Sequence, residues 1–551
     1  MFEADLHLSS MEFQTGAELT FSLPWEDISR DAEAIDLLEK NILAGYLKGC
    51  RWFGGKARRL AGICVDHVLS LPSPDPSPTL FHFFILKVKY RTGKSEDYLL
   101  PVSLVASADD VPQKGTITKS NYGWLIDAIY DEAFRSVIFH YLFHSSKIKQ
   151  KNGALFFEKG SAFHEADFSS AISSCVLDAD QSNSSLIYSP SPPEFIPMQS
   201  GGETESGSHG FFLKIYRKLF RETNPDVEVV KFLTEAHFTH IPSFAGTFFW
   251  KKAFGTPITF GMMQQKVTAI KDAWSLAGDY LNEFLFSLEG DKIVVPSSSI
   301  EQASLLGKRT AEMHASLASD ETDDAFIPET YNDEYTDWLL DNCDALLKRR
   351  LRLAKDCYSS LDDTGKDLTK FFISNAAKIR ESFSRIKTQS LQSLRTRIHG
   401  DYHLGQVLYD GSDYTILDFE GEPESSIKDR KIKHSPLKDV AGMLRSFHYA
   451  VSAKLYFSSE SHPLPAEKLE AAVALWYREV TQAFLNTYRE TMRGSSVFHA
   501  DQQELQFILQ FHLLEKAVYE LGYELNARPA WVKIPLKGIQ QVLSEIRSEE
   551  G

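Results

Sequence analysis

Residues 398–408 read IHGDYHLGQVL, and residues 414–423 read YTILDFEGEP. The first segment places a carboxylate, Asp401, in a tight turn, and the amide Gln406 follows at the start of a short apolar run. A turn sequence separates the two segments, so the second returns beside the first and ends at another carboxylate, Asp418. The sequence therefore predicts a hairpin that brings these three side chains together.

Two carboxylates and an amide in this arrangement suit phosphoryl transfer. Asp401 is the candidate catalytic residue, which orients a hydroxyl group of the substrate and accepts its proton. Gln406 and Asp418 supply the oxygen ligands that Mg²⁺ prefers, and Glu420 is a further candidate ligand. The alternative is a hairpin that carries ordinary surface acids.

The composition excludes several classes of protein. The chain has 551 residues, with 59 Lys and Arg against 75 Asp and Glu, and its net charge is −16. An acidic chain repels polyphosphate, so we expect no nucleic acid and no anionic membrane among its partners. A local basic pocket for one nucleotide remains compatible with this charge.

Cysteine usage and apolar runs indicate the compartment. The five cysteines are scattered and form no CxxC pair, which argues against a zinc site or a disulfide framework. The first ten residues lack the pattern of a signal peptide. The apolar run at residues 80–86 is far shorter than a membrane span. We therefore expect a cytoplasmic protein without membrane contact.

The patterns along the chain divide it into three parts. These are an α+β cap over residues 1–110, a β-rich part over 111–268 and a mainly helical part over 269–551 that contains the hairpin. The expected helices are 30–49, 301–318, 332–353, 367–392, 437–457, 465–491 and 501–525, and the expected strands of the cap are 62–71, 80–91 and 97–106. Residues 121–150 are expected to start with a short strand and to continue into a helix through Phe134 and Leu142. Residues 189–210 are rich in Ser, Pro and Gly and predict a hairpin extension.

The motifs HGDxHxGQ and DFEGEP resemble those of the maltokinases, a branch of the aminoglycoside-phosphotransferase-like group within the protein-kinase-like fold. Most of that group has Asn where this chain has Gln406. The segments RWFGGK at residues 51–56 and SPLKDVAGMLRSF at 435–447 also resemble the maltokinases. The resemblance implies a bilobal α+β kinase fold with an N-terminal cap, and ATP and Mg²⁺ as cofactors.

A kinase also needs a cation for the nucleotide phosphates, held by a carboxylate on a helix. Lys214 in the apolar strand pattern FFLKIY is the candidate cation, and Glu228 is its candidate partner. Asn224 and Pro225 precede Glu228 and predict the start of a helix. The positions of Lys214 in a strand and Glu228 in a helix match those of the maltokinase-like family. The alternative is a surface lysine and a first-turn glutamate favoured by the helix dipole.

The phosphate-facing turn and the adenine hinge are weaker predictions. The turn lacks GxGxxG, but its small polar side chains and backbone N–H groups are suitable donors to phosphate; the candidates are Gln181, Ser182, Asn183, Ser184 and Ser185. An ordinary turn is the alternative. Backbone groups near Gln265 and Val267 are the candidates for the hinge.

The sugar acceptor is expected on the C-terminal helices. Lys516, Tyr519, Glu520 and Tyr523 share one helical face, and Trp531 follows. Core packing is the alternative for these aromatic residues. His399 and Asp401 complete the substrate-facing set, and we favour a structural role for His399, in stabilising the catalytic turn, over a metal pair with His403.

The resemblance implies an ATP-dependent kinase that phosphorylates maltose at its anomeric hydroxyl and gives maltose 1-phosphate for α-glucan synthesis. Glucosamine, another sugar or an aminoglycoside is the alternative substrate. A kinase-like protein that binds a carbohydrate or a partner without catalysis is an alternative of another class. The resemblance also implies a functional or fused partnership with a trehalose synthase, and a monomer or weak dimer.

Overall fold

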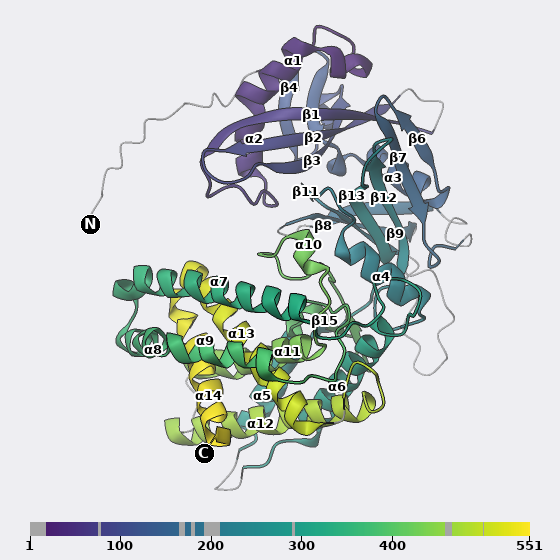
Figure 1. Ribbon diagram of the computed structural model, residues 1–551. Helices are drawn as coiled ribbons and strands as arrows, with labels where there is room; N and C mark the ends of the chain where they lie inside the picture. Colours follow the sequence, from purple (N-terminus) through teal and green to yellow (C-terminus); the bar gives the residue numbers. More distant parts are fainter. Residues whose placement is uncertain are drawn as a thin grey trace. The chain divides into compact units, whose positions relative to one another are not determined.

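The computed structural model describes residues 18–74, 79–164, 171–177, 182–191, 210–288, 293–457, 465–499 and 501–550. The chain forms two compact units, which are considered separately here (Figure 1). The first unit contains residues 1–227 and 243–267, and the second contains 228–242 and 268–551. The expected cap and β-rich parts therefore both contribute to the first unit.

The first unit contains two antiparallel sheets. The first sheet has the order β1-β2-β3-β5-β4, and a short strand, β11, pairs with β3. Its strands are β1 (Leu60–Pro72), β2 (Leu80–Tyr90), β3 (Glu96–Val105), β4 (Thr116–Ser120), β5 (Gly123–Asp127) and β11 (Lys218–Leu219). The expected strands of the cap are present, and the sheet continues past residue 110.

Two layers cover the first sheet, which explains the apolar run in β2. Alternate residues of a strand point to opposite faces. Phe83 and Ile85 belong to the core that the first sheet shares with the second sheet. Phe84 and Leu86 belong to the core beneath the N-terminal helices. These helices are α1 (Ala32–Leu37), a π-helical turn (Leu38–Ile42) and α2 (Leu43–Gly49).

The second sheet has the order β6-β7-β12-β13-β10-β9-β8. Its strands are β6 (Lys147–Gln150), β7 (Gly153–Lys159), β8 (Ala171–Leu177), β9 (Ser184–Ser191), β10 (Phe211–Ile215), β12 (Phe244–Lys251) and β13 (Ile258–Gln265). Helix α3 (Glu132–Phe143) packs on this sheet through Phe134, Ile138 and Phe139. The β9–β10 pairing agrees with the predicted hairpin, but residues 192–209 of the predicted extension lie outside the described residues.

The second unit is mainly helical and contains one small sheet. The sheet has the order β14-β15-β16, formed by β14 (Lys271–Asp272), β15 (Val407–Tyr409) and β16 (Tyr414–Ile416). The helices are α5 (Ala273–Phe286), α6 (Ser297–Leu317), α7 (Asp333–Cys357), α8 (Asp363–Ser374), α9 (Ala376–Ser384), α10 (Ile427–Arg430), α11 (Leu437–Phe457), α12 (Ala466–Thr491), α13 (Gln502–Ala527) and α14 (Lys533–Glu550). Helix α4 (Pro225–Glu235) contains the division between Val227 and Glu228.

One expected helix is two helices in the structure. The range 367–392 contains the end of α8 and all of α9, and Asn375 lies between them. Asn375 interrupts the helix through its backbone angles, φ −96° and ψ 9°, although its N–H still donates to the carbonyl oxygen of Phe371. Helices α5 and α14 lie outside the expected helical ranges.

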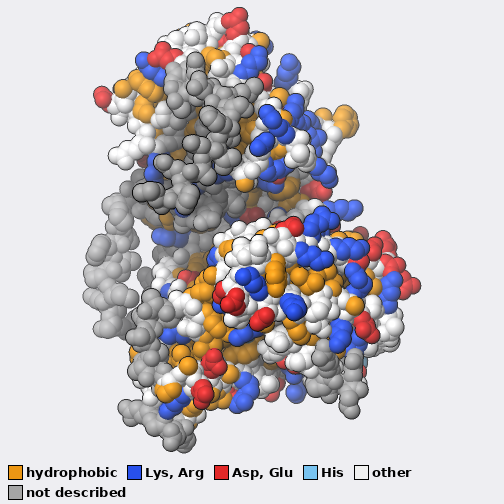
Figure 2. Space-filling view, turned by 90° about the vertical axis from the view of Figure 1, so that its left-hand side faces the viewer, with side chains coloured by type: hydrophobic (Ala, Val, Ile, Leu, Met, Phe, Trp, Pro, Cys, Tyr) orange, Lys and Arg blue, Asp and Glu red, His pale blue; other side chains and the backbone are white. Residues whose placement is uncertain are grey.

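The surface charge is uneven. Figure 2 shows Lys and Arg side chains gathered on the visible face of the first unit, although the chain as a whole is acidic. The net charge therefore does not describe this local surface. Within the described ranges, every helix is too short or too polar to cross a lipid bilayer.

Candidate functional site

The turn that carries Asp401 is anchored from beneath by helix α11. Asp439 is buried and accepts hydrogen bonds from the backbone N–H groups of His399, at 2.7 Å, and Gly400, at 2.9 Å. Gly400 has a φ of +87°, which few residues other than glycine adopt. The HGD sequence therefore forms the tight turn that we expected.

A buried network holds Asp439 in place. His314 of α6 lies 3.0 Å from Asp439 through Nε2 and 2.9 Å from the hydroxyl oxygen of Tyr488 through Nδ1. Burial by itself would raise the pKa of Asp439, but the hydrogen bonds to His314 and Gly400 outweigh burial and lower this pKa. The carboxylate thus stays charged and can accept both N–H groups of the turn.

His399 ties the turn to the hairpin. Its Nε2–H donates to the carbonyl oxygen of Leu417 at 2.8 Å, and its Nδ1 accepts from the backbone N–H of Asp401 at 3.3 Å. Both ring nitrogens are used by the backbone, so His399 stabilises the turn, and its place among the substrate contacts was wrong. Because Leu417 precedes Asp418, this bridge fixes the turn that carries Asp401 to the hairpin that carries Asp418.

The hairpin has the register that the sequence predicts. Val407 pairs with Ile416, and the amide Nε2 of Gln406 donates to Oδ2 of Asp418 at 3.1 Å. Asp418 has a φ of +65°, which is strained for a residue with a side chain and is typical of functional sites. The donor set of an amide oxygen and a carboxylate fits Mg²⁺. The carboxylate of Glu420 lies 4.0 Å from Arg430. The role of Glu420 as a further Mg²⁺ ligand stays a prediction.

Helix α13 holds Asp401 from the other side. Lys516 Nζ lies 3.1 Å from Asp401 Oδ1 and 3.1 Å from Glu422 Oε1. Burial alone would lower the pKa of Lys516, but the two carboxylates outweigh burial and raise this pKa well above its usual range. The lysine is therefore a fixed positive charge that positions Asp401.

A pocket opens next to this turn within the second unit. It comprises two adjoining hollows, and the larger has a volume of about 120 Å³. Both hollows share a set of lining residues, which are Leu346, Gly400, Glu422, Lys438, Glu515 and Tyr519. Trp338 and Arg430 line the larger hollow. The pocket lies beside Asp401, because the neighbouring residues Gly400 and Tyr402 line it.

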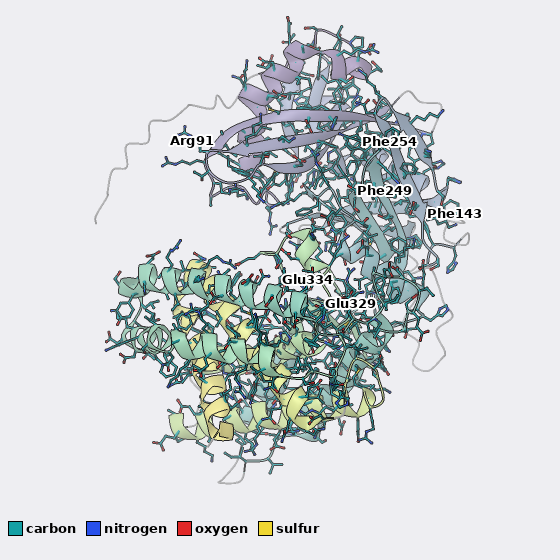
Figure 3. The ribbon with its side chains drawn as sticks, in the orientation of Figure 1. Arg91, Phe143, Phe249, Phe254, Glu329 and Glu334 are labelled. Atoms are coloured by element: carbon teal, nitrogen blue, oxygen red, sulfur yellow. The ribbon has the colours of Figure 1, made fainter. Side chains whose placement is uncertain are left out.

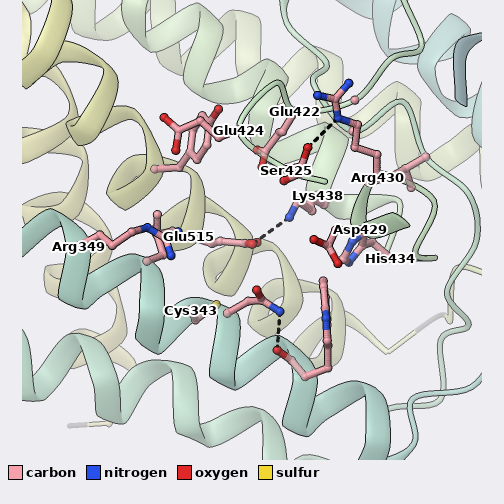
Figure 4. Close-up of a pocket in the computed structure, with 17 residues that line it drawn as sticks. Cys343, Arg349, Glu422, Glu424, Ser425, Asp429, Arg430, His434, Lys438 and Glu515 are labelled. Carbon is pink, nitrogen blue, oxygen red and sulfur yellow. Dashed lines mark hydrogen bonds and ion pairs between the residues drawn. The ribbon is translucent and has the colours of Figure 1, made fainter. Parts of the chain in front are cut away.

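Charged groups in the pocket are paired with each other (Figure 4). Lys438 Nζ lies 2.9 Å from Glu515 Oε1, and His512 lies 2.7 Å from the other oxygen of Glu515. Burial would raise the pKa of Glu515, but Lys438 and His512 outweigh burial and hold this pKa well below its usual range. Glu422, Lys438 and Glu515 were not among the predicted site residues. Two of them lie in quoted motifs, Glu422 in DFEGEP and Lys438 in SPLKDVAGMLRSF, and Glu515 directly precedes Lys516.

Only part of the predicted sugar-binding face lines this pocket. Lys516 and Tyr519 line it, as described. Glu520 instead forms a double hydrogen bond with Arg445, at 2.6 and 3.0 Å. Tyr523 is 55% exposed, and Trp531 stacks on Phe457 with ring centroids 4.4 Å apart. Glu520, Tyr523 and Trp531 therefore do not line this pocket, and their contact with a sugar stays a prediction.

The candidate phosphate-binding lysine has a different partner from the expected one. Lys214 Nζ lies 3.3 Å from Asp226 Oδ2, and Tyr216 donates to the same oxygen. Glu228 instead pairs with Arg397, at 3.3 Å, and with Lys431, at 2.6 Å. The assignment of Glu228 was wrong. Two residues along a helix rotate a side chain by about 200°, so Asp226 and Glu228 face opposite sides of α4.

The predicted phosphate-binding turn is mostly buried. Gln181 lies outside the described residues, Ser182 is exposed, and Asn183 and Ser185 are buried. The hydroxyl of Ser184 accepts a hydrogen bond from buried Arg217 at 2.7 Å, so this side chain contacts the interior of the first unit. A role of Ser184 and of the other residues of the turn in phosphate binding stays a prediction.

The predicted hinge lies at the end of the second sheet. Strand β13 ends at Gln265, whose N–H donates to the carbonyl oxygen of Ser243 at 2.9 Å. Val267 is the last residue of the first unit. The contact of either residue with adenine stays a prediction.

Comparison with known families and structures identifies the type of fold. Residues 46–131 match the maltokinase N-terminal cap domain, so the chain carries this domain as the RWFGGK segment suggested. A solved glucosamine kinase in complex with glucosamine, ADP and phosphate superposes with a TM-score of 0.58 at 16% identity, covering 87% of this chain and 94% of that chain. The expected α+β kinase fold with an N-terminal cap is confirmed.

Two curated glucosamine kinases match part of the sequence. The kinase from Streptacidiphilus jiangxiensis is 26% identical over 148 residues, and that from Mycolicibacterium smegmatis is 30% identical over 151 residues. Each match covers 27% of this chain, and the chain spans about a third of the length of these relatives, at 32% and 34%.

Proposed function

We propose that the protein is an ATP-dependent sugar kinase that transfers a phosphoryl group to the anomeric hydroxyl of maltose and releases maltose 1-phosphate for α-glucan synthesis. The observation that carries this proposal is the placement of Asp401 beside a pocket, held by Lys516 and tied through His399 to the Gln406–Asp418 pair. The maltokinase cap domain supports maltose as the substrate.

Asp401 performs the first task of the reaction. Its Oδ1 is occupied by Lys516, so Oδ2 remains to accept the hydrogen bond of the sugar hydroxyl. This hydrogen bond orients the hydroxyl toward the γ-phosphorus of ATP. Asp401 takes the proton as the new O–P bond forms and the bond to the β-phosphate oxygen breaks, with ADP as the leaving group. Because a hydroxyl is a weak nucleophile at neutral pH, positioning contributes much of the acceleration.

Gln406 and Asp418 would hold Mg²⁺ through oxygen atoms, and bound Mg²⁺ neutralises charge on the phosphates. In the first unit, Lys214 supplies a cation for the phosphates of ATP. The carboxylate of Asp226 holds the ammonium group of Lys214 in place. The backbone N–H of Asp226 in turn donates to Oδ1 of Asn224 at 3.0 Å. The backbone after β13 supplies the contacts for adenine.

The pocket carries charges of both signs. Glu422 is paired with Lys516, and Glu515 is paired with Lys438. Asp429, which accepts a hydrogen bond from Ser426, also lines the larger hollow, so the charges of the pocket do not distinguish a neutral sugar from an amino sugar. Tyr519 offers an aromatic face and a hydroxyl for a sugar ring.

Glucosamine is the second candidate substrate, because the matching curated relatives are glucosamine kinases. A kinase-like protein without catalysis is disfavoured, because Lys214, Asp401, Gln406 and Asp418 are all present in suitable surroundings. The partnership with a trehalose synthase stays a prediction.

The test is an ATP-consumption assay with maltose, glucose, glucosamine, trehalose and an aminoglycoside, followed by NMR of the products. We expect turnover with maltose and a product whose anomeric carbon and proton couple to phosphorus. Turnover with glucosamine alone would replace maltose by the second candidate. The absence of turnover with every acceptor, in protein that binds ATP with Mg²⁺, would favour the non-catalytic alternative.

A further inference from the structure

The first unit contains a hollow that the proposed reaction does not use. Its volume is about 160 Å³, and it lies where β1, β2 and β3 of the first sheet meet the hairpin between β12 and β13. The lining residues are Asp66, His67, Ile85, Asp97, Arg221, Trp250, Lys252, Phe254, Gly255, Thr256 and Ile258. All of them belong to the first unit.

An aromatic residue stands at the rim without packing partners of its own. Phe254 lies in the turn between β12 and β13 and is 101% exposed (Figure 3). Full exposure of a phenyl ring is unfavourable in water, and because Phe254 also lines the hollow, its ring can cover a ligand bound there. A flat apolar ring beside polar groups suits the C–H face of a sugar.

The wall of the hollow contains a hydrogen-bond donor that lacks an acceptor. Trp250 is 1% exposed, and its indole Nε1–H has no hydrogen-bond partner among the described residues. A buried donor without an acceptor costs free energy, about 1–3 kcal/mol for a polar group of this kind. The ring contacts His67 at a centroid distance of 4.7 Å, and Lys252 Nζ lies 5.0 Å from its centroid.

The charges in the hollow balance each other. Asp66 and Asp97 oppose Arg221 and Lys252, so the formal sum is zero. Burial and the neighbouring Lys252 lower the pKa of His67, which keeps the imidazole neutral at pH 7. A hollow without net charge discriminates against strongly charged ligands.

The polar groups keep unused hydrogen-bonding capacity. Arg221 lies 3.6 Å from Asp97, and His67 lies 3.6 Å from Asp66, and both distances exceed that of a hydrogen bond. These carboxylates and the guanidinium are therefore available to hydroxyl groups, which both donate and accept. A ligand with many hydroxyl groups and no charge matches this set best.

We propose that this hollow is a second carbohydrate site, which binds one neutral hexosyl residue with its ring against Phe254 and its hydroxyl groups on Asp66, Asp97 and Arg221. The hexosyl residue belongs to a free disaccharide or to the end of an α-glucan chain, since both present the same chemistry. The site is non-catalytic, and it does not depend on the reaction proposed above.

The test uses the full chain labelled with 5-fluorotryptophan and observed by fluorine NMR. The Trp250 signal is assigned by its loss in Trp250→Phe, and the signal of Trp338, in the pocket beside Asp401, is assigned by Trp338→Phe. The added probes are maltose, maltoheptaose and glucose 6-phosphate. Because each tryptophan reports on one pocket, failure of this inference is distinguishable from failure of the proposed function.

We expect maltose or maltoheptaose to shift the Trp250 signal saturably, and glucose 6-phosphate to leave it in place. A response to both neutral sugars indicates a free or terminal hexosyl residue, and a response to maltoheptaose alone indicates a glucan chain. Phe254→Ala should weaken this binding at least tenfold, whereas Phe249→Ala on the preceding strand β12 should not, because Phe249 stacks on Phe156 and lies outside the hollow.

Three results would overturn the inference. The first is a Trp250 signal that no neutral sugar moves at concentrations up to tens of millimolar. The second is a signal that responds only to the phosphate ester. The third is a Phe254→Ala protein with native circular dichroism that binds the sugar as tightly as the unmodified chain.

Discussion

At the scale of single residues, the pair formed by Lys516 and Asp401 makes the catalytic proposal testable. Asp401→Asn keeps the size and a hydrogen-bonding oxygen but removes the charge that accepts a proton. We expect kcat to fall by about 10²–10⁴-fold, the usual contribution of a general base, with nucleotide affinity preserved. A coupled ATP assay and calorimetry with ADP and Mg²⁺ measure the two quantities.

The control for this substitution is Asp36→Asn, which removes an exposed carboxylate paired with Lys40 on an N-terminal helix. Surface pairs of this kind contribute little, so both activity and stability should stay close to those of the unmodified chain. An Asp401→Asn protein with normal turnover would remove Asp401 from the mechanism.

Glu515 gives a second prediction at this scale, concerning pH. Its pKa in the folded protein lies well below the ordinary value of 4.5, because Lys438 and His512 outweigh the effect of burial. A depressed carboxyl pKa stabilises the fold above the unfolded-state pKa, and this contribution is lost as the pH falls. Glu515→Gln leaves Lys438 buried without a partner and should cost about 3–5 kcal/mol at pH 7.

The difference in unfolding free energy between Glu515→Gln and the unmodified chain should therefore be largest near neutral pH and should shrink below about pH 4.5. Urea unfolding at pH 7, 5 and 4 measures it. A difference that is independent of pH would show that the charge of Glu515 contributes nothing and that only packing was lost.

At the scale of elements, the contact between helix α11 and the catalytic turn depends on one glycine. A Cβ atom at Gly442 would lie 2.6 Å from the carbonyl oxygen of Tyr402, the residue after Asp401. Gly442→Ala must therefore push the turn away from the helix. We expect a loss of about 1–3 kcal/mol of stability and a marked fall in kcat, measured by thermal unfolding and by the ATP assay.

Gly278→Ala on α5 is the matched control, because a Cβ atom there meets no atom within 4 Å. Replacement of an unconstrained helical glycine by alanine usually stabilises by about 0.5–1 kcal/mol. If Gly442→Ala and Gly278→Ala had the same stability and the same kcat, α11 would not fix the turn.

Elements that are defined by local patterns were predictable. The hairpin of β15 and β16 follows from apolar runs on either side of a turn sequence, and the strands β1, β2 and β3 follow from their apolar patterns. The break at Asn375 was not predicted, because helical spacing continues across it and only the backbone angles of this one residue depart from the helix.

At the scale of the whole molecule, a buried ion pair joins the parts of the first unit. Arg217 is 0% exposed and lies 2.7 Å from Asp127 at the end of β5, and it also donates to Ser184 of β9. The first and second sheets therefore share this one side chain. The cap and the second sheet should accordingly unfold together.

The variant Arg217→Met tests whether the cap and the second sheet unfold together. Breaking a buried pair at one partner costs about 3–5 kcal/mol, because Asp127 is left charged and buried. In a unit of this size we expect the melting temperature to fall by roughly 10 °C, with one transition for both sheets, as followed by calorimetry. Arg30→Met, at an exposed pair with Asp27, should change little. Independent melting of the cap would contradict the shared role of Arg217.

The sequence by itself determined the hairpin of this protein. The strands at 407–409 and 414–416 pair within one short segment, so their spacing predicts that Gln406 lies against Asp418, whereas the turn at His399 and Gly400 also needs Asp439 of α11. The apolar patterns likewise determined the kinase-like division into β-rich and helical parts. Contacts between residues that are close in the sequence can be predicted from the sequence, because they depend on local geometry.

Only the tertiary structure decided which partner each charged side chain takes. Lys214 pairs with Asp226 and not with Glu228, and Glu520 faces Arg445 and not the pocket. Lys438 and Glu515, which are distant in sequence, meet in the pocket wall. Such choices depend on how helices rotate and cross when the core packs, and a one-residue change in helical rotation moves a side chain by about 100°.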